Sequence, residues 1–292
     1  MSDKQPHLFC FGLGYVGLVL AKQLLDQGWK VSGSLREASQ ISQLRSLGVN
    51  AFVFNSQDKD QDVVELPLAD VTHILSTIPP GIDGDPVCEL LRDCKDVSWI
   101  GYLSTTGVYG NTEGKLVDET CPVKPGSSRA ARRVEAERRW LALFEESSLP
   151  VHIFRLPGIY GPGRCVFEQY KEKRLRRIDK PGHLFNRVHV DDIAQVLQAS
   201  MKKSNPGTIY NVCDDFPSEP ANVATYACEL MGVEPPPLVP FEQAVKTMSP
   251  MALSFWQDNR RVSNARMKSE LGVTLHYPDY RSGLKAIWEG MH

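Results

Sequence analysis

Short apolar runs alternate with stretches of helical periodicity through the first half of the chain. The runs typical of strands occupy residues 7–11, 30–34, 51–54, 73–77, 99–104 and 151–156. Helical periodicity begins at Tyr15 for a first helix, returns after the strand 30–34 for a second helix through Leu44, and recurs around Leu90 and over about 128–146. Parallel strands need such crossovers, so the pattern predicts an α/β fold with a Rossmann-type, doubly wound parallel sheet.

The regular alternation of predicted strands and helices ends at about residue 160, and only isolated elements are predicted beyond it. Pro-rich breaks lie at residues 78–86 and 233–240. We therefore predict a dinucleotide-binding Rossmann core over residues 1–160 and a mostly smaller C-terminal lobe over residues 161–292. A segment near residues 187–215 is predicted to return to the core.

Composition narrows the class of protein. A chain of 292 residues with 42% hydrophobic residues can bury a substantial core. Its 33 basic and 35 acidic side chains nearly cancel, which leaves no general field for nucleic acid or an anionic membrane. The sequence shows neither a signal-peptide layout nor the run of ~18 apolar residues that a membrane span needs. We expect a cytoplasmic protein whose seven cysteines are reduced, without a metal site.

A glycine-rich loop stands between the first predicted strand and the first predicted helix. In "CFGLGYVGLVL", Gly12 permits the tight turn, Gly14 lets backbone approach a pyrophosphate, and Gly17 lets the helix pack on the strand. The helix N-terminus adds favourable N–H dipoles. This context predicts a dinucleotide site, with Tyr15 and Val16 among its contacts.

The end of the second strand bears on which dinucleotide binds. An NAD site typically carries Asp or Glu there, whereas this chain reads "VSGSLRE", with Ser34 and Arg36. A guanidinium forms charge-assisted hydrogen bonds with a 2′-phosphate, and Ser34 could add a neutral one. We predict NADP(H) in preference to NAD(H). The alternative is that Arg36 begins a solvated helix and Glu37 neutralises it.

Four further motifs follow in order: "YLSTTGVYG" (102–110), "RLPGIYGPGR" (155–164), "RVHVDDIA" (187–194) and "IYNVCDD" (209–215). Behind the glycine loop, they resemble the extended short-chain dehydrogenase/reductases, the NAD(P)-dependent epimerase/dehydratase group, over nearly the whole chain. The resemblance implies a small substrate lobe and a nicotinamide near the ends of strands four to six. Cofactor contacts are then expected from Thr77, Pro79, Ser104 and Pro157.

The resemblance also implies a catalytic corner. In that family a Ser or Thr hydrogen-bonds the substrate oxygen, and Thr105 falls on its position, beside Thr106. A catalytic Tyr and a Lys four residues later should follow, but the stretch "PGSSRAARRVEAE" (125–137) places Arg129 and Arg133 there. The chain therefore resembles an atypical member that lacks the Tyr-x-x-x-Lys pair.

Two arginines change what this corner can do. A guanidinium has a pKa above about 12 and no acceptor lone pair, so Arg129 cannot cycle a proton as tyrosine does. We predict that Thr105 orients the substrate oxygen, that Arg129 binds or polarises it, and that Arg133 positions the cofactor. The alternative is that both arginines are plain surface charges left after loss of the site.

Two cations favour an anionic substrate. Further substrate contacts are expected from Thr106, Tyr160 and Arg164, whereas Arg155 either adds to this field or is buried structure. The basic stretch 170–183 either contacts substrate or is a solvated helix face. The candidates for proton transfer, each with a structural alternative, are Tyr109, Tyr160, His183 and His189.

Two function classes remain open. One is an NADP(H)-dependent oxidoreductase or epimerase-type enzyme acting on a small anionic or nucleotide-sugar-like substrate. The other is a non-catalytic NADP(H)-binding sensor or regulatory module. Either is expected to bind a small molecule, with no nucleic acid or membrane partner, as a monomer or a homodimer.

Overall fold

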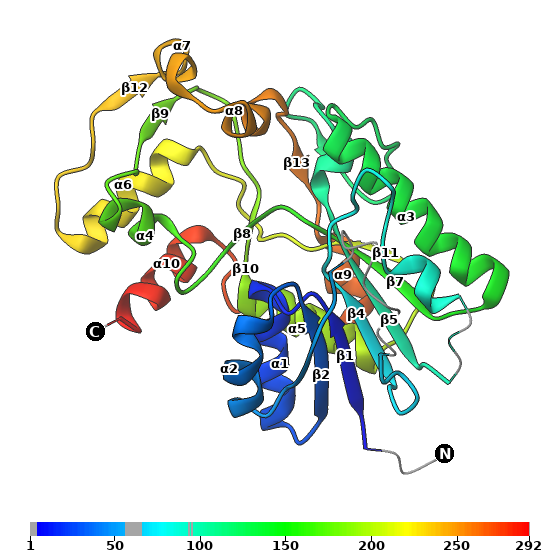
Figure 1. Ribbon diagram of the computed structural model, residues 1–292. Helices are drawn as coiled ribbons and strands as arrows, with labels where there is room; N and C mark the ends of the chain where they lie inside the picture. Colours follow the sequence, from blue (N-terminus) through cyan, green and yellow to red (C-terminus); the bar gives the residue numbers. More distant parts are fainter. Residues whose placement is uncertain (1–4, 56–65, 93, 95, 292) are drawn as a thin grey trace. The chain divides into compact units, whose positions relative to one another are not determined.

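A seven-stranded sheet combines five strands from the first half of the chain with two from the second half. The computed structural model describes residues 5–55, 66–92, 94 and 96–291. The strand order is β11-β7-β5-β4-β1-β2-β3 (Figure 1). The strands are β1 (His7–Phe11), β2 (Lys30–Leu35), β3 (Asn50–Val53), β4 (His73–Ser76), β5 (Trp99–Thr105), β7 (Val151–Leu156) and β11 (Ile209–Asn211). Strand β1 pairs in parallel with both β2 and β4, and β2–β3 and β4–β5 are also parallel. The predicted Rossmann-type fold is confirmed.

Helices connect these strands in the alternating order that the sequence predicts. They are α1 (Tyr15–Asp26), α2 (Ile41–Ser46), α3 (Ser128–Ser147) and α5 (Val190–Lys202). The strand order reverses at β1, from which the chain runs first to β2 and β3 and later to β4 and β5. Ligands of such sheets bind beyond the carboxyl ends of the strands at this switch point. The loop that follows β1 is therefore the expected cofactor position.

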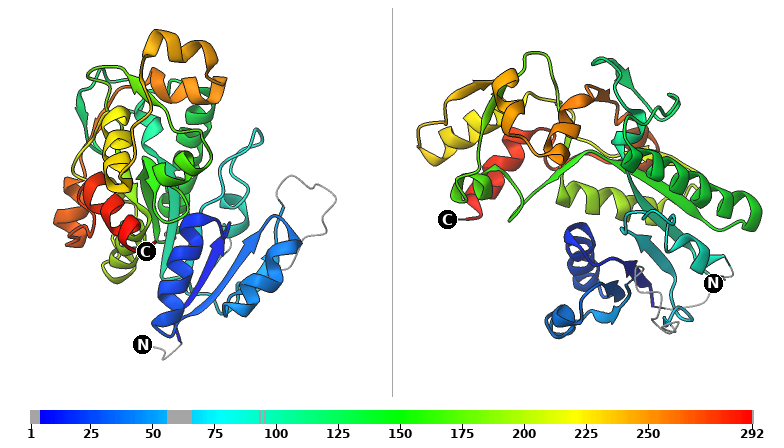
Figure 2. Two further views of the ribbon diagram at one scale, coloured as in Figure 1. Left: turned by 90° about the vertical axis from the view of Figure 1, so that its left-hand side faces the viewer. Right: turned by 45° about the horizontal axis from the view of Figure 1, so that its top comes forward.

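Helix α3 is an unbroken helix of 20 residues (Figure 2). Its start is capped by the Ser127 hydroxyl, which accepts from the Ala130 N–H at 3.2 Å. Ala136, Trp140 and Leu143 form its buried stripe, at the three- and four-residue spacing of one helix face. This stripe packs α3 into the apolar core that also includes Phe9 and Ile153.

The remaining elements form smaller sheets and helices. They are β6 (Leu116–Val117), β8 (Gly158–Tyr160), α4 (Val166–Lys171), β9 (Arg177–Asp179), β10 (Arg187–His189), α6 (Pro220–Met231), β12 (Leu238–Pro240), α7 (Phe241–Ala244), α8 (Pro250–Gln257), β13 (Arg261–Val262), α9 (Ala265–Leu271) and α10 (Tyr280–Glu289). The two-stranded sheets β8–β10, β9–β12 and β6–β13 are parallel. A second apolar core, which includes Phe167, Val223 and Leu284, holds several of these helices together.

The chain divides into two compact units that interleave along the sequence. The first unit comprises residues 1–104, 132–154 and 194–210, and the second comprises residues 105–131, 155–193 and 211–292. These units reflect packing. The division by function at residue 160, into a core that binds the cofactor and a lobe that binds the substrate, is a separate statement and stays a prediction.

The helix predicted around Leu90 is wrong in type. Over the described residues it is a 3₁₀ turn, Cys88–Leu91, in which the Leu90 N–H donates to the Val87 carbonyl at 3.0 Å. The Asp85 carboxylate accepts from the N–H groups of Val87 and Cys88 at 2.9 and 3.0 Å. The Asp85 side chain thus accepts hydrogen bonds from backbone N–H groups at the start of this turn, as a capping residue does.

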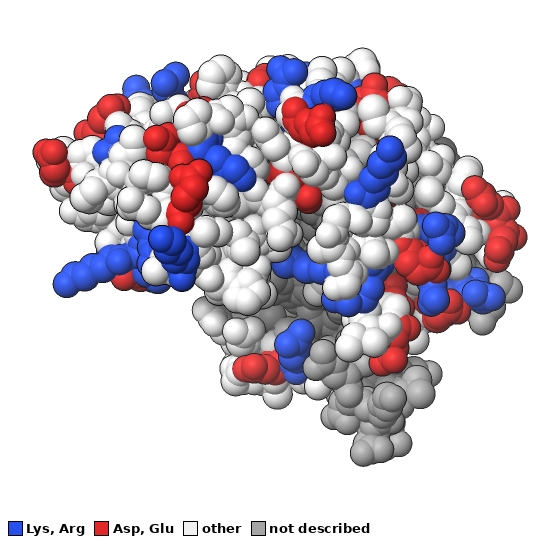
Figure 3. All heavy atoms as spheres, turned by 90° about the horizontal axis from the view of Figure 1, so that it is seen from above, with Lys and Arg blue, Asp and Glu red and all other residues white. Residues whose placement is uncertain are grey.

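The face of the molecule seen in Figure 3 shows no dominant charge. On the face seen in Figure 3, Lys and Arg side chains are interspersed with Asp and Glu, in line with a formal net charge of −2. Among the described residues, no helix is both long and apolar enough to cross a membrane.

Candidate functional site

The glycine loop is shaped by residues from two neighbouring strand ends. Gly12 has φ of +84°, and a Cβ built there would lie 2.7 Å from Thr77 Oγ1. The Thr77 hydroxyl donates to the Gly12 carbonyl at 2.5 Å, and the Gly12 N–H donates to the Ser34 hydroxyl at 3.2 Å. Glycine is therefore required at residue 12 by both its backbone conformation and its neighbours.

The other two glycines have opposite surroundings. A Cβ on Gly17 would lie 2.9 Å from Cys10 Sγ and 3.2 Å from the Gly12 carbonyl oxygen, so this glycine allows α1 to pack against β1. A Cβ on Gly14 would meet nothing within 4 Å. No side chain in the described chain caps α1 at Gly14, and its first turn holds no acidic residue. Open space at uncapped N–H groups suits a pyrophosphate.

The end of β2 presents Arg36 but not Ser34. Ser34 is fully buried and its hydroxyl oxygen accepts the Gly12 N–H, so Ser34 supports the loop, and its hydrogen bond to a 2′-phosphate stays a prediction. Arg36 is exposed. Within the described residues it forms no ion pair with Glu37 or any other carboxylate. Its guanidinium is thus accessible to an anionic ligand.

The other predicted cofactor residues differ in access. Tyr15, Thr77 and Pro157 are partly buried and Pro79 is exposed. Val16 is 6% exposed, so its side chain is buried. Its predicted contact with a phosphate would come from its backbone N–H in the first turn of α1. These contacts stay predictions.

Two polar contacts connect α3 to the end of β5. Arg133 Nη1 donates to the Leu103 carbonyl at 2.6 Å and to the Tyr102 hydroxyl at 3.1 Å. One helical turn later, the buried Glu137 carboxylate accepts from the Ser104 hydroxyl at 2.5 Å. Arg133 is thereby held as a fixed cation at the end of β5. The Ser104 hydroxyl donates its proton to Glu137, so only its oxygen is left as an acceptor for a cofactor.

The predicted substrate-binding residues of the second unit fall into two groups. Thr105 is half-buried, and its hydroxyl oxygen accepts from the Gly107 N–H at 3.0 Å, which leaves the hydroxyl proton available for donation. Arg129 and Arg164 are exposed. Thr106 is only 2% exposed, so its side chain faces the interior. Thr105, Arg129 and Arg164 keep the accessibility that a substrate contact requires.

Tyr160, predicted to contact substrate, belongs to the core of the second unit. It is 7% exposed, and its hydroxyl donates to the Asp279 carbonyl at 3.3 Å. Its ring packs edge-on against His189, with centroids 5.1 Å apart. The prediction of a substrate contact is wrong because this side chain points into the packing between β8 and α10 and not to solvent.

The four proton-transfer candidates are all buried, including Tyr109 at 1% and His189 at 1% exposure. Burial raises the pKa of Tyr109, whose hydroxyl donates to Asn211 Oδ1 at 2.9 Å and accepts from Arg155 Nη1 at 2.8 Å. Desolvation lowers the pKa of His183 and of His189 to about 4. In this structure these groups, and the buried Arg155, serve packing and internal hydrogen bonds.

Arg260 is a residue that the sequence analysis missed. Its Nη1 donates to the Gly110 carbonyl at 3.0 Å and pairs with Asp258 at 2.9 Å. A Cβ on Gly107 would lie 3.9 Å from Arg260 Nη2, so this guanidinium lies beside the segment that follows Thr105. Some 150 residues separate Arg260 from Gly110. Only a predicted tertiary contact could have identified it.

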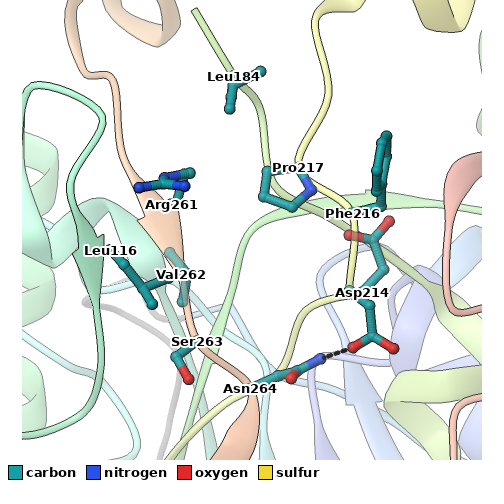
Figure 4. Close-up of a pocket in the computed structure, with 10 residues that line it drawn as sticks. Leu116, Leu184, Asp214, Phe216, Pro217, Arg261, Val262, Ser263 and Asn264 are labelled. Atoms are coloured by element: carbon teal, nitrogen blue, oxygen red, sulfur yellow. Dashed lines mark hydrogen bonds between the residues drawn. The ribbon is translucent and has the colours of Figure 1, made fainter.

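The second unit also contains a cavity of about 350 Å³ (Figure 4). Its lining is formed by Leu116, Leu184, Asp214, Asp215, Phe216, Pro217, Arg261, Val262, Ser263 and Asn264. Asp214 is 3% exposed, and burial raises the pKa of its carboxyl to about 8. No group of His, Cys, Asp or Glu side chains in the described parts of the chain is arranged to hold a metal ion.

Comparison with known proteins identifies relatives that share the Rossmann-type fold of this chain. The model of the NAD dependent epimerase/dehydratase family matches residues 84–213. The protein YeeZ of Escherichia coli K12 is 28% identical over 282 residues, which cover 92% of this chain and 95% of YeeZ. A solved structure of a functionally unknown conserved protein from Silicibacter pomeroyi is 45% identical, covers 98% of this chain and 99% of its own, and has a TM-score of 0.90.

More distant structures show the same fold. The dTDP-glucose 4,6-dehydratase of Bacillus anthracis, solved in complex with NAD, is 17% identical with a TM-score of 0.77 and covers 97% of this chain and 96% of its own. The glycine loop, the strand order and the similarity to these structures all indicate a Rossmann-type fold. Residues 84–213 of the chain match the NAD dependent epimerase/dehydratase family, and more distant structures share the fold of the whole chain.

Proposed function

We propose that this chain is an NADP(H)-binding oxidoreductase or epimerase-type protein that acts on a small anionic substrate. The observation that carries the cofactor preference is the exposed Arg36 at the end of β2, where the described chain offers no carboxylate to pair with it. A carboxylate there would hydrogen-bond the ribose of NAD, whereas a free guanidinium favours a 2′-phosphate.

The chain's own residues divide the work of binding. The open backbone at Gly14 receives the pyrophosphate, and Arg133, fixed by the Leu103 carbonyl, holds a positive charge near the nicotinamide ribose. The cofactor, when bound, supplies or accepts the hydride. The Thr105 hydroxyl donates a hydrogen bond to the substrate oxygen, and the exposed Arg129 pairs with a carboxylate or phosphate of the substrate.

The position of Arg129 in the catalytic pattern limits the rate of such a reaction. General acid–base catalysis typically contributes about 10²–10⁴-fold, and an arginine cannot supply it near neutral pH. Positioning of the two reactants is a separate and larger contribution that Thr105 and Arg133 can still make. Slow hydride transfer, with water carrying the proton, is therefore the expected chemistry.

The test compares NADPH and NADH binding to wild type and to Arg36→Ala by calorimetry. We expect Arg36→Ala to weaken NADPH binding by about 10- to 100-fold, the range for a hydrogen bond to a charged group, and to leave NADH binding unchanged. Arg45→Ala, which removes another exposed arginine of the same unit, is the matched control. An unchanged ratio of the two affinities in Arg36→Ala would overturn the NADP(H) preference.

A second function, a non-catalytic NADP(H) sensor, is favoured by the burial of every tyrosine and histidine considered for proton transfer. A sensor must bind NADP⁺ and NADPH with different affinities, since equal binding shifts no population. Thermal-shift titrations with both forms separate the two functions. Different affinities without NADPH oxidation across a carbonyl and sugar-nucleotide panel support the sensor.

A further inference from the structure

The cavity of the second unit has a mixed lining, in which five apolar side chains stand beside five polar or charged ones. Phe216 and Leu116 are 52% and 61% exposed, and the buried Val262 lies at the base of the lining. In Figure 4, Leu116 and Arg261 lie on one side of the cavity, and Phe216 and Pro217 lie on the other. Large apolar side chains kept exposed around a cavity of this size are typical of a ligand site.

The charges around the cavity do not cancel. Asp215 is neutralised, because its Oδ1 accepts from Lys268 Nζ at 2.5 Å and from Asn264 Nδ2 at 2.7 Å. The Arg261 guanidinium donates through Nε to the Gly114 carbonyl at 2.9 Å, and no carboxylate of the described residues lies within ion-pair distance of it. Arg261 is therefore the uncompensated charge of the lining at neutral pH, provided that Asp214 is neutral.

Asp214 is kept neutral by its surroundings. It is 3% exposed, and burial raises its pKa to about 8, although the Arg187 guanidinium and the Phe216 backbone N–H favour the ionised form. The charged and titratable groups that face it are Arg187, Asp215, Asp279, Tyr160 and Cys213. Burial also raises the pKa of Tyr160 and of Cys213, so neither becomes charged before Asp214 does.

We propose that this cavity binds a small organic monoanion, whose apolar ring packs against Phe216 and Pro217 and whose acidic group pairs with Arg261. The apolar side chains of the lining provide the contact for the ring, and the terminal nitrogens of the Arg261 guanidinium can pair with a carboxylate. The site lies within the second unit and requires no nucleotide. Its test is accordingly independent of the proposed cofactor function.

The first experiment titrates nucleotide-free protein at pH 7 with 2-naphthoate and with the neutral 2-naphthamide. We expect naphthoate to bind roughly tenfold more tightly, and Arg261→Gln to abolish that difference while Arg261→Lys partly restores it. Phe216→Ala should weaken both compounds, since both lose the aromatic contact. Arg45→Gln, an exposed arginine of the first unit, is the matched control and should bind both compounds as wild type does.

The second experiment repeats the naphthoate titration from pH 7 to pH 9. Affinity should fall as the pH rises through about 8, because ionised Asp214 repels the anion. Asp214→Asn, which has nearly the same volume and stays neutral, should remove that fall. Equal binding of naphthoate and naphthamide, or an Arg261→Gln variant that still prefers naphthoate, would overturn the proposal.

Discussion

Two substitutions in one loop separate the structural from the ligand-binding glycines. Gly12→Ala forces an L-residue to φ of +84° and places its Cβ 2.7 Å from Thr77 Oγ1 and 2.9 Å from Ile78 Cγ1. The backbone conformation costs about 1–2 kcal/mol and the overpacking a further ~1–3 kcal/mol. Thr77 cannot turn away without losing its 2.5 Å hydrogen bond to the Gly12 carbonyl. We expect Gly12→Ala to lower the free energy of unfolding by about 2–5 kcal/mol.

Gly14→Ala makes the same chemical change two residues away, with the opposite expected result. Gly14 has φ of −84° and ψ of −163°, an extended conformation that alanine adopts, and its Cβ would meet nothing within 4 Å. Stability should stay constant or rise by about 0.4–1 kcal/mol, because alanine restricts the unfolded chain. The added methyl group points into the space expected for the pyrophosphate, so NADPH binding should fall.

The assay is urea unfolding of nucleotide-free protein, followed by circular dichroism, together with NADPH titration of the same samples. Nucleotide must be absent during unfolding, since a ligand that binds only the native state raises its apparent stability. A Gly12→Ala protein as stable as wild type would refute the steric argument. A Gly14→Ala protein that binds NADPH with unchanged affinity would refute the assignment of the pyrophosphate position.

Two further predictions concern buried polar groups of the second unit. Tyr109→Phe removes the hydroxyl that joins Arg155 to Asn211 and leaves both groups without that partner. Urea unfolding should show a free energy of unfolding lower by about 1–3 kcal/mol. No change would show that another partner replaces the hydroxyl. Asp214 binds its proton more tightly when folded, because its pKa rises from 3.8 to about 8. Its contribution should therefore destabilise the fold progressively as the pH rises from about 4 to 8. Asp214→Asn should gain stability relative to wild type across that window, and a constant difference would contradict the raised pKa.

Local pattern was sufficient wherever a residue's role depends on its near neighbours in the chain. Strands 7–11 and 151–156 and the start of the first helix at Tyr15 agree with the structure to the residue. Alternating short apolar runs and helical crossovers leave few ways to bury a parallel sheet, so the sequence by itself determined the Rossmann-type fold. It also located the glycine loop, because the loop's chemistry depends on spacing within a single turn.

Only the tertiary structure decided which polar side chains are available for chemistry. Ser34 and Tyr160 stand in suitable motifs, but Ser34 supports the loop and Tyr160 packs in the second core. Arg133 reaches the end of β5, whereas Arg129, one turn earlier on the same helix, is exposed. Burial and hydrogen bonding depend on residues tens to hundreds of positions away, as the contact between Arg260 and Gly110 shows. A linear motif records the spacing of side chains but not which partner each one meets after folding.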